Sequence, residues 1–288
     1  MVKPLSLEQA DALYQQFQHR VSLRGLMRIV GLSYWRLRDY RRVSARRQAA
    51  AAQARQLVMQ VKQAALESPT YGYRRLWQVL KGQELLVGRE RLRGMLRALG
   101  LSQSVIRKPR RQIPIIRVES EWPEGRRVQI DATRLALADG VSWGYLVEDV
   151  ASRMCLAASV GPSVNQERAV ETLLAGRDRL VDFGIDEPLL IQSDGGSDFT
   201  SVRFQSCCEE LGQWVRCRVN QVGGMGILER LNRTFKYESV FRDEIETSGQ
   251  LSAHLPEFQR WYNEERLHSR LNYPTPQQVL LQEVTALT

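Results

Sequence analysis

The sequence of 288 residues contains no long hydrophobic run and no export signal. No apolar stretch approaches the roughly 18 residues of a membrane-spanning helix, and the N-terminus lacks the apolar core of a signal peptide. Both absences argue against a membrane or secreted protein, so we expect a soluble chain in the cytoplasm. With 43% hydrophobic residues, the chain has enough apolar side chains for a packed core.

Cysteine and histidine are also scarce, with four and three copies. The cysteines show neither C-x-x-C nor Cys/His spacing, and the histidines lie far apart, so a zinc site is not expected. Scattered thiols in a cytosolic protein are typically small core side chains.

Acidic residues are few in the first part of the chain. Residues 1–122 carry 24 Lys and Arg against 8 Asp and Glu, a net charge of +16. Residues 123–288 carry 17 against 24, a net charge of −7. The overall charge of +9 therefore hides an asymmetry that predicts binding of a polyanion by the first part.

Two helix-turn-helix-like units are predicted in this basic part. In the first, residues 23–30 form an amphipathic helix, residues 31–33 form a break with Ser33 as the helix N-cap, and residues 34–42 form a basic second helix. A small helical bundle with a solvated basic face is the alternative. Residues 45–63, rich in Ala, Gln and Arg, are expected to form a connecting helix.

The second unit begins at residue 68 with a helix that reaches Leu80 and breaks at residues 81–82. A further helix over residues 88–99 ends at Gly100, the expected C′ residue. Its apolar residues at helical spacing should lie in the core, whereas its arginines, which recur every four residues, should face outward.

Basic side chains of both units, and of the stretch that follows them, are the candidate nucleic-acid contacts. They are Arg36, Arg38, Arg41, Arg42, Arg74, Arg75, Arg89, Arg93, Arg97, Arg107, Lys108, Arg110 and Arg111. The last four belong to a basic, proline-containing linker, which either follows DNA or is a solvated tether.

After residue 123 the hydrophobic period changes from helical to strand-like and then alternates. Strands are predicted near residues 126–132, 143–150, 153–160, 188–193 and 213–219, and helices near 165–182, 200–211 and 226–240. Three strands before the first helix, followed by alternation, is the ribonuclease-H-like order. In this α/β fold the first and fourth strands are neighbours.

Three carboxylates lie where such a fold would gather them. Asp131 and Asp194 each close an apolar run, and Glu229 lies in a helical stretch. Two negative charges about 4 Å apart cost roughly 4 kcal/mol at an effective dielectric near 20, so a cluster of three predicts bound cations. Oxygen ligands suit Mg²⁺, and two such ions can stabilise the attacking and leaving oxygens of a phosphoryl displacement. Singly, each acid is also explained by a turn or a solvated helix face.

Two other acids compete for this site. Asp149 also follows a strand, but the second strand of this fold ends away from Asp131, so we expect a structural role. Asp198 could accept a hydrogen bond behind the metal ligands or cap the following helix, and capping is the expected role.

The order of Asp131, the Ser-Asp-Gly-Gly-Ser motif at 193–197 and the Glu-Arg-Leu-Asn-Arg-Thr-Phe-Lys motif at 229–236 resembles the catalytic core of retroviral-integrase-type DDE transposases. Lys236 matches a basic residue with which this family contacts DNA, and it shares a helix face with Glu229. Arg233 is a further candidate contact on this helix. Residues 261–276 resemble the closing motif of bacterial insertion-sequence transposases, and residues 70–75 resemble the module before their catalytic core.

The resemblance covers about residues 20 to 280 and implies four parts. They are an N-terminal helix-turn-helix-like region with its connecting helix (1–63), a second helix-turn-helix-like module (64–101), a basic linker (102–122) and an integrase-type ribonuclease-H-like core with a helical extension (123–288). All-α DNA-binding modules thus precede an α/β catalytic core.

The resemblance also implies a reaction. A transposase hydrolyses one strand at the element's end and then uses the exposed 3′-hydroxyl to attack another phosphodiester. Asp131, Asp194 and Glu229 would hold two Mg²⁺, for which Mn²⁺ would substitute, and Lys236 would position the scissile strand.

The implied partners are the element's terminal inverted repeats, target DNA and further copies of the chain in a dimer or higher multimer. Relatives of this length are often fused by ribosomal frameshifting to an upstream-frame product, which is a further expected partner. The implied location is the bacterial cytoplasm, in association with the nucleoid when DNA is bound.

The sequence departs from the family at two places. Residues 223–226 replace a Pro-x-Asp-Asn-type segment, and Gln192 stands where many relatives have His. Two rival interpretations remain: a ribonuclease-H-like nuclease or resolvase, and a catalytically silent helix-turn-helix regulator.

Overall fold

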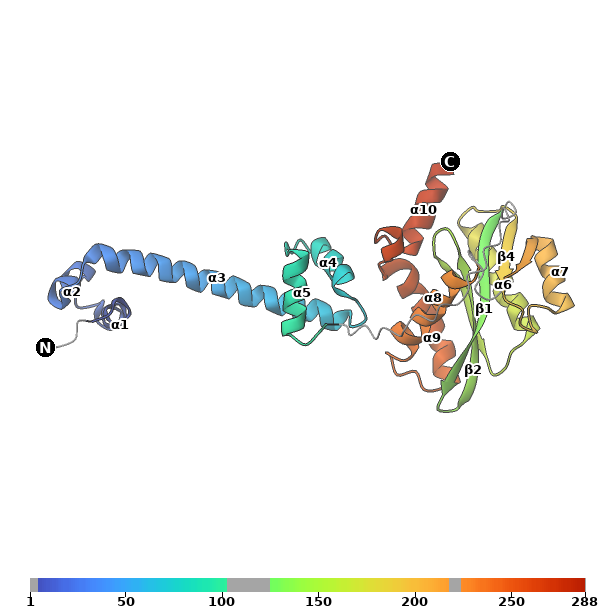
Figure 1. The fold of residues 1–288 in the computed structure, drawn as a ribbon, viewed down its shortest axis with the longest axis horizontal. Coiled ribbons are helices and arrows are strands. Elements are labelled where there is room, and N and C mark those ends of the chain that lie inside the picture. Colours follow the sequence, from blue (N-terminus) through green and yellow to red (C-terminus); the bar gives the residue numbers. More distant parts are fainter. Residues whose placement is uncertain (1–4, 103–124, 218–223, 288) are drawn as a thin grey trace, which may run out of the picture. The chain divides into compact units, whose positions relative to one another are not determined.

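The computed structural model describes residues 5–102, 125–217 and 224–287 (Figure 1). The chain divides into two compact units, which we call the front unit (Met1–Ser104) and the core unit (Val105–Thr288). The linker candidates Arg107, Lys108, Arg110 and Arg111 lie outside the described residues. None of the helices in the described ranges is both long enough and apolar enough to cross a membrane.

The front unit begins with α1 (Leu7–Phe17), α2 (Leu23–Val30) and α3 (Tyr34–Glu67). Ser33 occupies the N-cap position of α3, although its side chain makes no capping hydrogen bond. The prediction of separate helices at 34–42 and 45–63 was wrong, because α3 is continuous through both. Residues 34–67 contain neither Gly nor Pro and are rich in Ala, Arg and Gln, so nothing in the sequence ends this helix.

The second half of the front unit contains α4 (Tyr73–Gly82) and α5 (Arg89–Ala98). Both helices pack on the end of α3 through a core that includes Leu80 and Leu92. The outward-facing arginines of α5 are exposed, as predicted. Gly100 follows α5 with φ +68°, and the amide of Leu101 donates to the carbonyl of Leu96, which confirms Gly100 as the residue that ends this helix.

The core unit is built on a five-stranded sheet. Its strands are β1 (Arg126–Leu137), β2 (Gly140–Asp149), β3 (Cys155–Gly161), β4 (Leu189–Ser193) and β5 (Gly212–Arg216). The order across the sheet is β3-β2-β1-β4-β5; β1, β2 and β3 are antiparallel, whereas β4 is parallel to both β1 and β5. This is the ribonuclease-H-like arrangement that the sequence predicts.

Helices cover both faces of the sheet (Figure 1). On one face, α6 (Gln166–Asp182) and α7 (Val202–Leu211) pack on side chains of alternate strand positions. On the other face lie α8 (Gly226–Thr234), α9 (Ser248–Arg260) and the π-helical turns η1 (Phe235–Val240) and η2 (Trp261–Glu265). All four cysteines are buried, as expected.

The predicted single helix over residues 226–240 changes type along its length. It is α-helical as far as Thr234 and continues as the π-helical turn η1. Such turns often occur at functional sites, and they result from tertiary packing and not from a recognisable sequence pattern.

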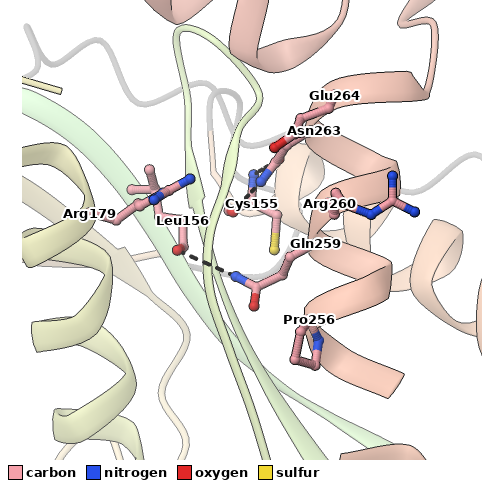
Figure 2. A pocket seen from close by; sticks show the side chains of 8 residues that line it. All are labelled: Cys155, Leu156, Arg179, Pro256, Gln259, Arg260, Asn263 and Glu264. Carbon is pink, nitrogen blue, oxygen red and sulfur yellow. Dashed lines mark hydrogen bonds between the residues drawn. The ribbon is translucent and has the colours of Figure 1, made fainter. Parts of the chain in front are cut away.

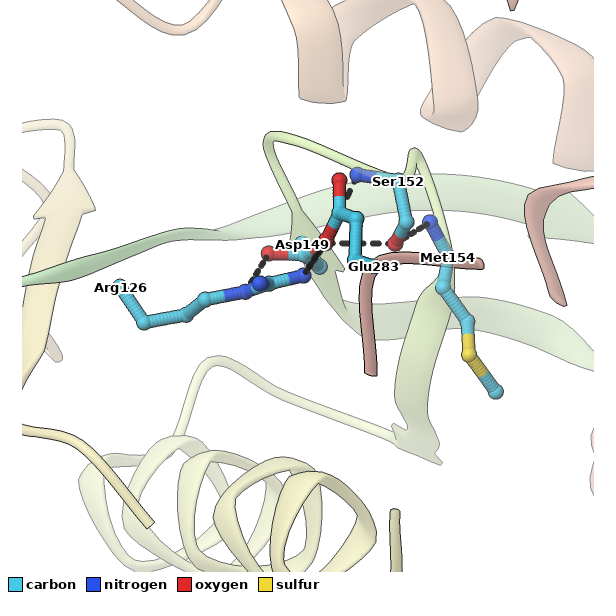
Figure 3. Close-up of polar contacts among 5 residues, drawn as sticks. All are labelled: Arg126, Asp149, Ser152, Met154 and Glu283. Carbon is cyan, nitrogen blue, oxygen red and sulfur yellow. Dashed lines mark hydrogen bonds and ion pairs between the residues drawn. The ribbon is translucent and has the colours of Figure 1, made fainter. Parts of the chain in front are cut away.

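The C-terminal helix α10 (Pro276–Leu287), which follows the short turn η3 (Ser269–Leu271), is held to the start of β1 by an ion-pair cluster (Figure 3). Arg126 donates from Nε and Nη2 to the two carboxylate oxygens of Asp149 at 2.8 and 2.6 Å, and from Nη2 to Glu283 at 2.9 Å. The amide of Ser152 donates to the same Asp149 carboxylate at 2.8 Å. The contacts of the buried Asp149 are therefore structural, as predicted.

The closing motif near the C-terminus covers the edge strand β3 (Figure 2). Asn263 donates from Nδ2 to the carbonyl of Cys155 and accepts from its amide, both at 2.9 Å. Gln259 donates to the carbonyl of Leu156 at 3.4 Å. These side chains satisfy the backbone groups that an edge strand leaves unpaired. A pocket lies beside them, between β3, α9 and Arg179 of α6.

Arg266 of the same motif is almost fully buried, with 1% of its surface exposed. It donates from Nε and Nη2 to the two carboxylate oxygens of Glu238 in η1, at 2.9 and 3.0 Å. The motif therefore holds η1 in place.

Candidate active site

Asp131 and Asp194 are brought together by the pairing of β1 with β4. The two strands run parallel as far as the pair Gln129 and Gln192. Two residues beyond this pair, the same register sets Asp131 beside Asp194, which directly follows β4. The prediction that Asp131 ends its strand was wrong, because the hairpin with β2 carries β1 on to Leu137. What ends near Asp131 is the neighbouring strand β4.

A buried pair of amide side chains lies just before these carboxylates. Gln129 donates from Nε2 to Oε1 of Gln192 at 2.8 Å and to the carbonyl of Gly224 at 2.9 Å. Its own Oε1 accepts from the amide of Leu228 at 3.0 Å. Gln129 thus fastens the start of α8 to β1. The two departures from the family pattern meet here, because Gln192 and the described part of the glycine segment share Gln129 as a partner.

Glu229 lies in the first turn of α8, and the same helix contacts Asp131 directly. Asn232 donates from Nδ2 to Oδ2 of Asp131 at 2.7 Å, while the amide of Ala132 donates to Oδ1 at 2.9 Å. Asn232 is 8% exposed, and its Oδ1 has no hydrogen-bond partner among the residues that the structure describes. We assigned Asn232 no role from the sequence, although its spacing of three residues from Glu229 puts both on one side of the helix.

The three carboxylates form one electrostatic site. The pKa of Asp131 is raised to about 7, first by burial, next by the negative charge of Asp194 and least by that of Glu229. The hydrogen bonds from Ala132 and Asn232 act in the opposite direction because they favour the charged form.

Lys236 lies within the field of the same carboxylate. Burial lowers the pKa of Lys236, the negative charge of Asp131 opposes this shift, and the positive charge of Arg134 adds to it. Lys236 is therefore close enough to Asp131 for a charge interaction from the first turn of η1. Arg134, an exposed residue of β1, is a neighbouring cation that the sequence did not single out.

The loop after Asp194 has little free space. The amide of Gly196 donates to Oδ1 of Asp194 at 2.9 Å. A Cβ at Gly196 would lie 2.6 Å from Oδ1 of Asp198, so any larger residue there would displace the Asp198 carboxylate. The guanidinium of Arg216, at the end of β5, lies against Gly195 and brings another exposed cation to this edge that the sequence did not single out.

The capping role predicted for Asp198 was wrong. Ser201 is the N-cap of α7, and its hydroxyl accepts from the amide of Phe204 at 3.3 Å. Asp198 is buried and instead accepts from the hydroxyl of Tyr145 at 2.7 Å. The buried carboxylate of Asp198 therefore serves as the hydrogen-bond acceptor for Tyr145 and does not cap α7.

Within the described part of the chain, no group of three or more His, Cys, Asp and Glu side chains converges closely enough to bind a metal ion. The structure thus presents Asp131, Asp194 and Glu229 as interacting neighbours and not as a formed metal centre. The donor set nevertheless fits a hard divalent cation, because all three are oxygen ligands. A cation would also offset the repulsion that raises the pKa of Asp131.

The structure places the remaining DNA-contact candidates on exposed or partly exposed surfaces. Arg233 of α8 is exposed, and so are Arg36, Arg38, Arg42, Arg74, Arg89, Arg93 and Arg97 of the front unit. Arg41 pairs with Asp11 at 3.0 Å and lies over the ring of Tyr14, and Arg75 lies over the ring of Tyr71. Their roles in DNA binding stay predictions.

Two family models match parts of this chain. The HTH-like domain matches residues 52–110, and the integrase core domain matches residues 213–276. The transposase for insertion sequence element IS904 of Lactococcus lactis subsp. lactis (strain IL1403) is 29% identical over 90 residues, which cover 31% of this chain and 36% of that protein. The match thus spans about a third of the length of this curated relative.

Solved structures of retroviral proteins are also similar. The simian T-cell lymphotropic virus intasome in complex with PP2A regulatory subunit B56 gamma is 17% identical, with 70% of this chain and 73% of that chain covered and a TM-score of 0.46. The catalytic core of BIV integrase is 20% identical, with 57% and 99% covered and a TM-score of 0.43. These likenesses are weak, and it is the strand order of the sheet that defines the fold.

The sheet order defines a ribonuclease-H-like fold, and part of the core unit matches the integrase core domain. Helix-turn-helix-like helices precede this core. Both matched models and the transposase relative make the chain similar to the DDE transposases of bacterial insertion sequences, the family that its motifs resemble.

Proposed function

We propose that this chain cleaves one DNA strand at the end of an insertion sequence and joins the resulting 3′-hydroxyl to a second DNA. The observation that carries the proposal is the pairing of β1 with β4, whose register sets Asp131 beside Asp194, together with the charge interaction of Asp131 with Glu229. These residues come from β1, the loop after β4 and α8, so only the folded core unit gathers them. A cluster of this kind suits chemistry at a phosphodiester, where negative charge must be offset.

Asp131, Asp194 and Glu229 would hold the divalent cations. Two Mg²⁺ or Mn²⁺ ions, when bound, supply Lewis-acid stabilisation of the attacking and leaving oxygens. Asn232 and the amide of Ala132 orient the Asp131 carboxylate and favour its charged form. Gln129 holds the start of α8, and with it Glu229, against β1.

Basic residues near the carboxylates would position the DNA strand. Lys236 lies in the field of Asp131, and Arg233 is exposed on the same helix. Their positive charges would hold the phosphates on either side of the reacting bond. The exposed arginines of the front unit would bind the duplex farther from that bond, and their contribution would fall as salt rises.

The partners follow from this chemistry. The front unit would bind the element's terminal inverted repeats, and the core unit would also accept target DNA. Two ends must be held together for insertion, so we expect a dimer or higher multimer of this chain on DNA. An upstream-frame product, free or fused by frameshifting, is a further expected partner, and the bacterial cytoplasm with its nucleoid is the expected location.

A strand-transfer assay tests the proposal. The parent chain is incubated with Mg²⁺, a duplex carrying a labelled 3′-hydroxyl at an element end and an unlabelled target duplex. We expect labelled products longer than the donor strand. Metal-dependent nicking without joined products would indicate a nuclease or resolvase, and DNA binding without nicking would indicate a regulator.

A further inference from the structure

The helix that carries Glu229 and Lys236 has a buried side. Leu228, Leu231 and Phe235 point into the core between this helix and the sheet, and each is fully buried. This side fixes the rotation of α8 and η1 about their common axis. The remaining side chains of α8 and η1 therefore lie on fixed faces outside the core.

One flank of this helix faces the carboxylate site. Asn232 contacts Asp131 by a hydrogen bond, and Lys236 lies in the field of the same residue. The opposite flank faces the closing motif, where Thr234 and Glu238 accept hydrogen bonds from Arg266.

An exposed ridge lies between the two flanks and consists of Arg233, Tyr237 and Phe241. Tyr237 is 63% exposed and Phe241 is 47% exposed. Their rings meet edge to face, with centroids 5.5 Å apart and planes at 74°. Residues four apart lie on one face of a helix, so Tyr237 follows Arg233 along this ridge and Phe241, directly after η1, follows Tyr237.

These two rings are unusual in the core unit. Among its described residues, Tyr237 and Phe241 are the exposed aromatic side chains, whereas the other large exposed apolar residues are aliphatic. Exposed apolar area of this kind marks an interaction site when it is contiguous. Two exposed rings suit a flat partner. Arg233 lies at one end of the rings and Lys236 directly precedes Tyr237, so the partner should also be negatively charged.

We propose that Tyr237 and Phe241 form a stacking site for an unpaired base of the DNA strand that the carboxylate site holds. This inference rests on the proposed function and adds a second type of contact to it. Aromatic rings beside cations are the usual means by which proteins bind single-stranded nucleic acid, because every base offers a flat face. Enzymes that act on duplex DNA can move a base out of the stack beside the reacting bond, and stacking on a protein ring would offset part of that cost.

The test uses the full chain and a forked DNA, a duplex with one unpaired arm that carries 2-aminopurine beside the junction. A blunt duplex with the same sequence is the second probe, and Ca²⁺ replaces Mg²⁺ so that the DNA stays intact. Stacking on an aromatic ring quenches 2-aminopurine, so we expect binding of the parent to quench the fluorescence of the forked probe. We expect Tyr237→Phe to retain this quench.

Loss of a ring should affect the forked probe alone. We expect Tyr237→Leu and Phe241→Leu to lose most of the quench and to bind the forked probe about tenfold more weakly, with unchanged affinity for the blunt duplex. Val202→Ala removes an apolar side chain that is 82% exposed on α7, and we expect it to behave like the parent.

Parental quench and affinity in both leucine variants would overturn the stacking site. The stacking site would also be overturned if sedimentation shows that these variants lose self-association while their quench is unchanged. The ridge would then bind a second copy of the chain. The proposed function has a separate readout, which is strand joining by the parent in Mg²⁺. A ring-dependent quench without joining would support the stacking site and contradict the proposed function alone.

Discussion

Asn232 of α8 donates a hydrogen bond to Asp131 of β1, with 2.7 Å between Nδ2 and Oδ2. The bond connects the helix that carries Glu229 to the strand that carries the first carboxylate. Because it favours the charged form of Asp131, it acts against the burial and the neighbouring charges that raise the pKa of this group.

Replacement of Asn232 should therefore weaken metal-dependent activity. We expect Asn232→Ala to require more Mg²⁺ and to lower strand joining about 10- to 100-fold, because a carboxylate that loses its orienting donor binds a cation less well. Asn232→Asp should be more harmful, since it replaces the donor with another negative charge. A titration of joining rate against Mg²⁺ measures both effects, and a parental Mg²⁺ curve for Asn232→Ala would contradict this role.

Lys236 permits a test that separates function from folding. We expect Lys236→Ala to reduce strand joining about 10- to 100-fold through misplacement of the strand. Thermal unfolding and binding to duplex DNA should change little, because the side chain lies only partly buried on the helix surface. Lys236→Arg keeps the charge and should recover part of the joining. If the alanine variant joins at the parental rate, and crosslinking from position 236 does not reach the terminal nucleotides, Lys236 has no role at the strand.

The charge asymmetry of the chain predicts where duplex DNA binds. A fragment of residues 1–122 should bind duplex DNA by itself, with an affinity that falls steeply as salt rises, because each phosphate contact releases counterions. A fragment of residues 123–288, which carries net negative charge, should bind far more weakly. Gel shifts of both fragments at several salt concentrations give the comparison. Equal affinities of the two fragments at one salt concentration would contradict the assignment of duplex binding to residues 1–122.

A buried acid predicts the pH dependence of stability. Burial raises the pKa of Glu148 well above its ordinary range, with the positive charge of Arg153 opposing the shift. The folded state thus favours the protonated acid, and this contribution to stability is lost as the pH rises from the ordinary pKa of a glutamic acid towards the raised value. We expect Glu148→Gln, which cannot ionise, to lose less stability than the parent between about pH 5 and about pH 8. Urea unfolding at both pH values measures the difference, and parallel changes in the two proteins would contradict it.

The sequence predicts the sheet well because strand periodicity is a local property. The runs that end near Asp131 and Asp194 each have the apolar pattern of a buried strand, and their order in the chain is enough to make the two strands neighbours. The start of α8 was also predicted, since the apolar spacing after residue 226 is helical. The adjacency of Asp131 and Asp194 followed from the fold.

The contacts behind the carboxylates could not be predicted because they depend on residues far apart in the chain. Gln129 meets Gln192 and Leu228 only after β1, β4 and α8 have packed. The π-helical turn after Thr234 and the pairing of Arg266 with Glu238 depend on the same packing. Asp198 was misassigned for this reason, because its partner, Tyr145, lies on another strand.

The most direct measurement is strand joining by three variants that keep the shape of each carboxylate but remove its charge: Asp131→Asn, Asp194→Asn and Glu229→Gln. Each is assayed in Mg²⁺ and in Mn²⁺, with binding to duplex DNA as the control for folding. We predict that each variant binds duplex DNA like the parent and joins no detectable strand in either metal, because each has lost one charged ligand. Joining within about tenfold of the parent by any one variant would show that its carboxylate is not part of the site.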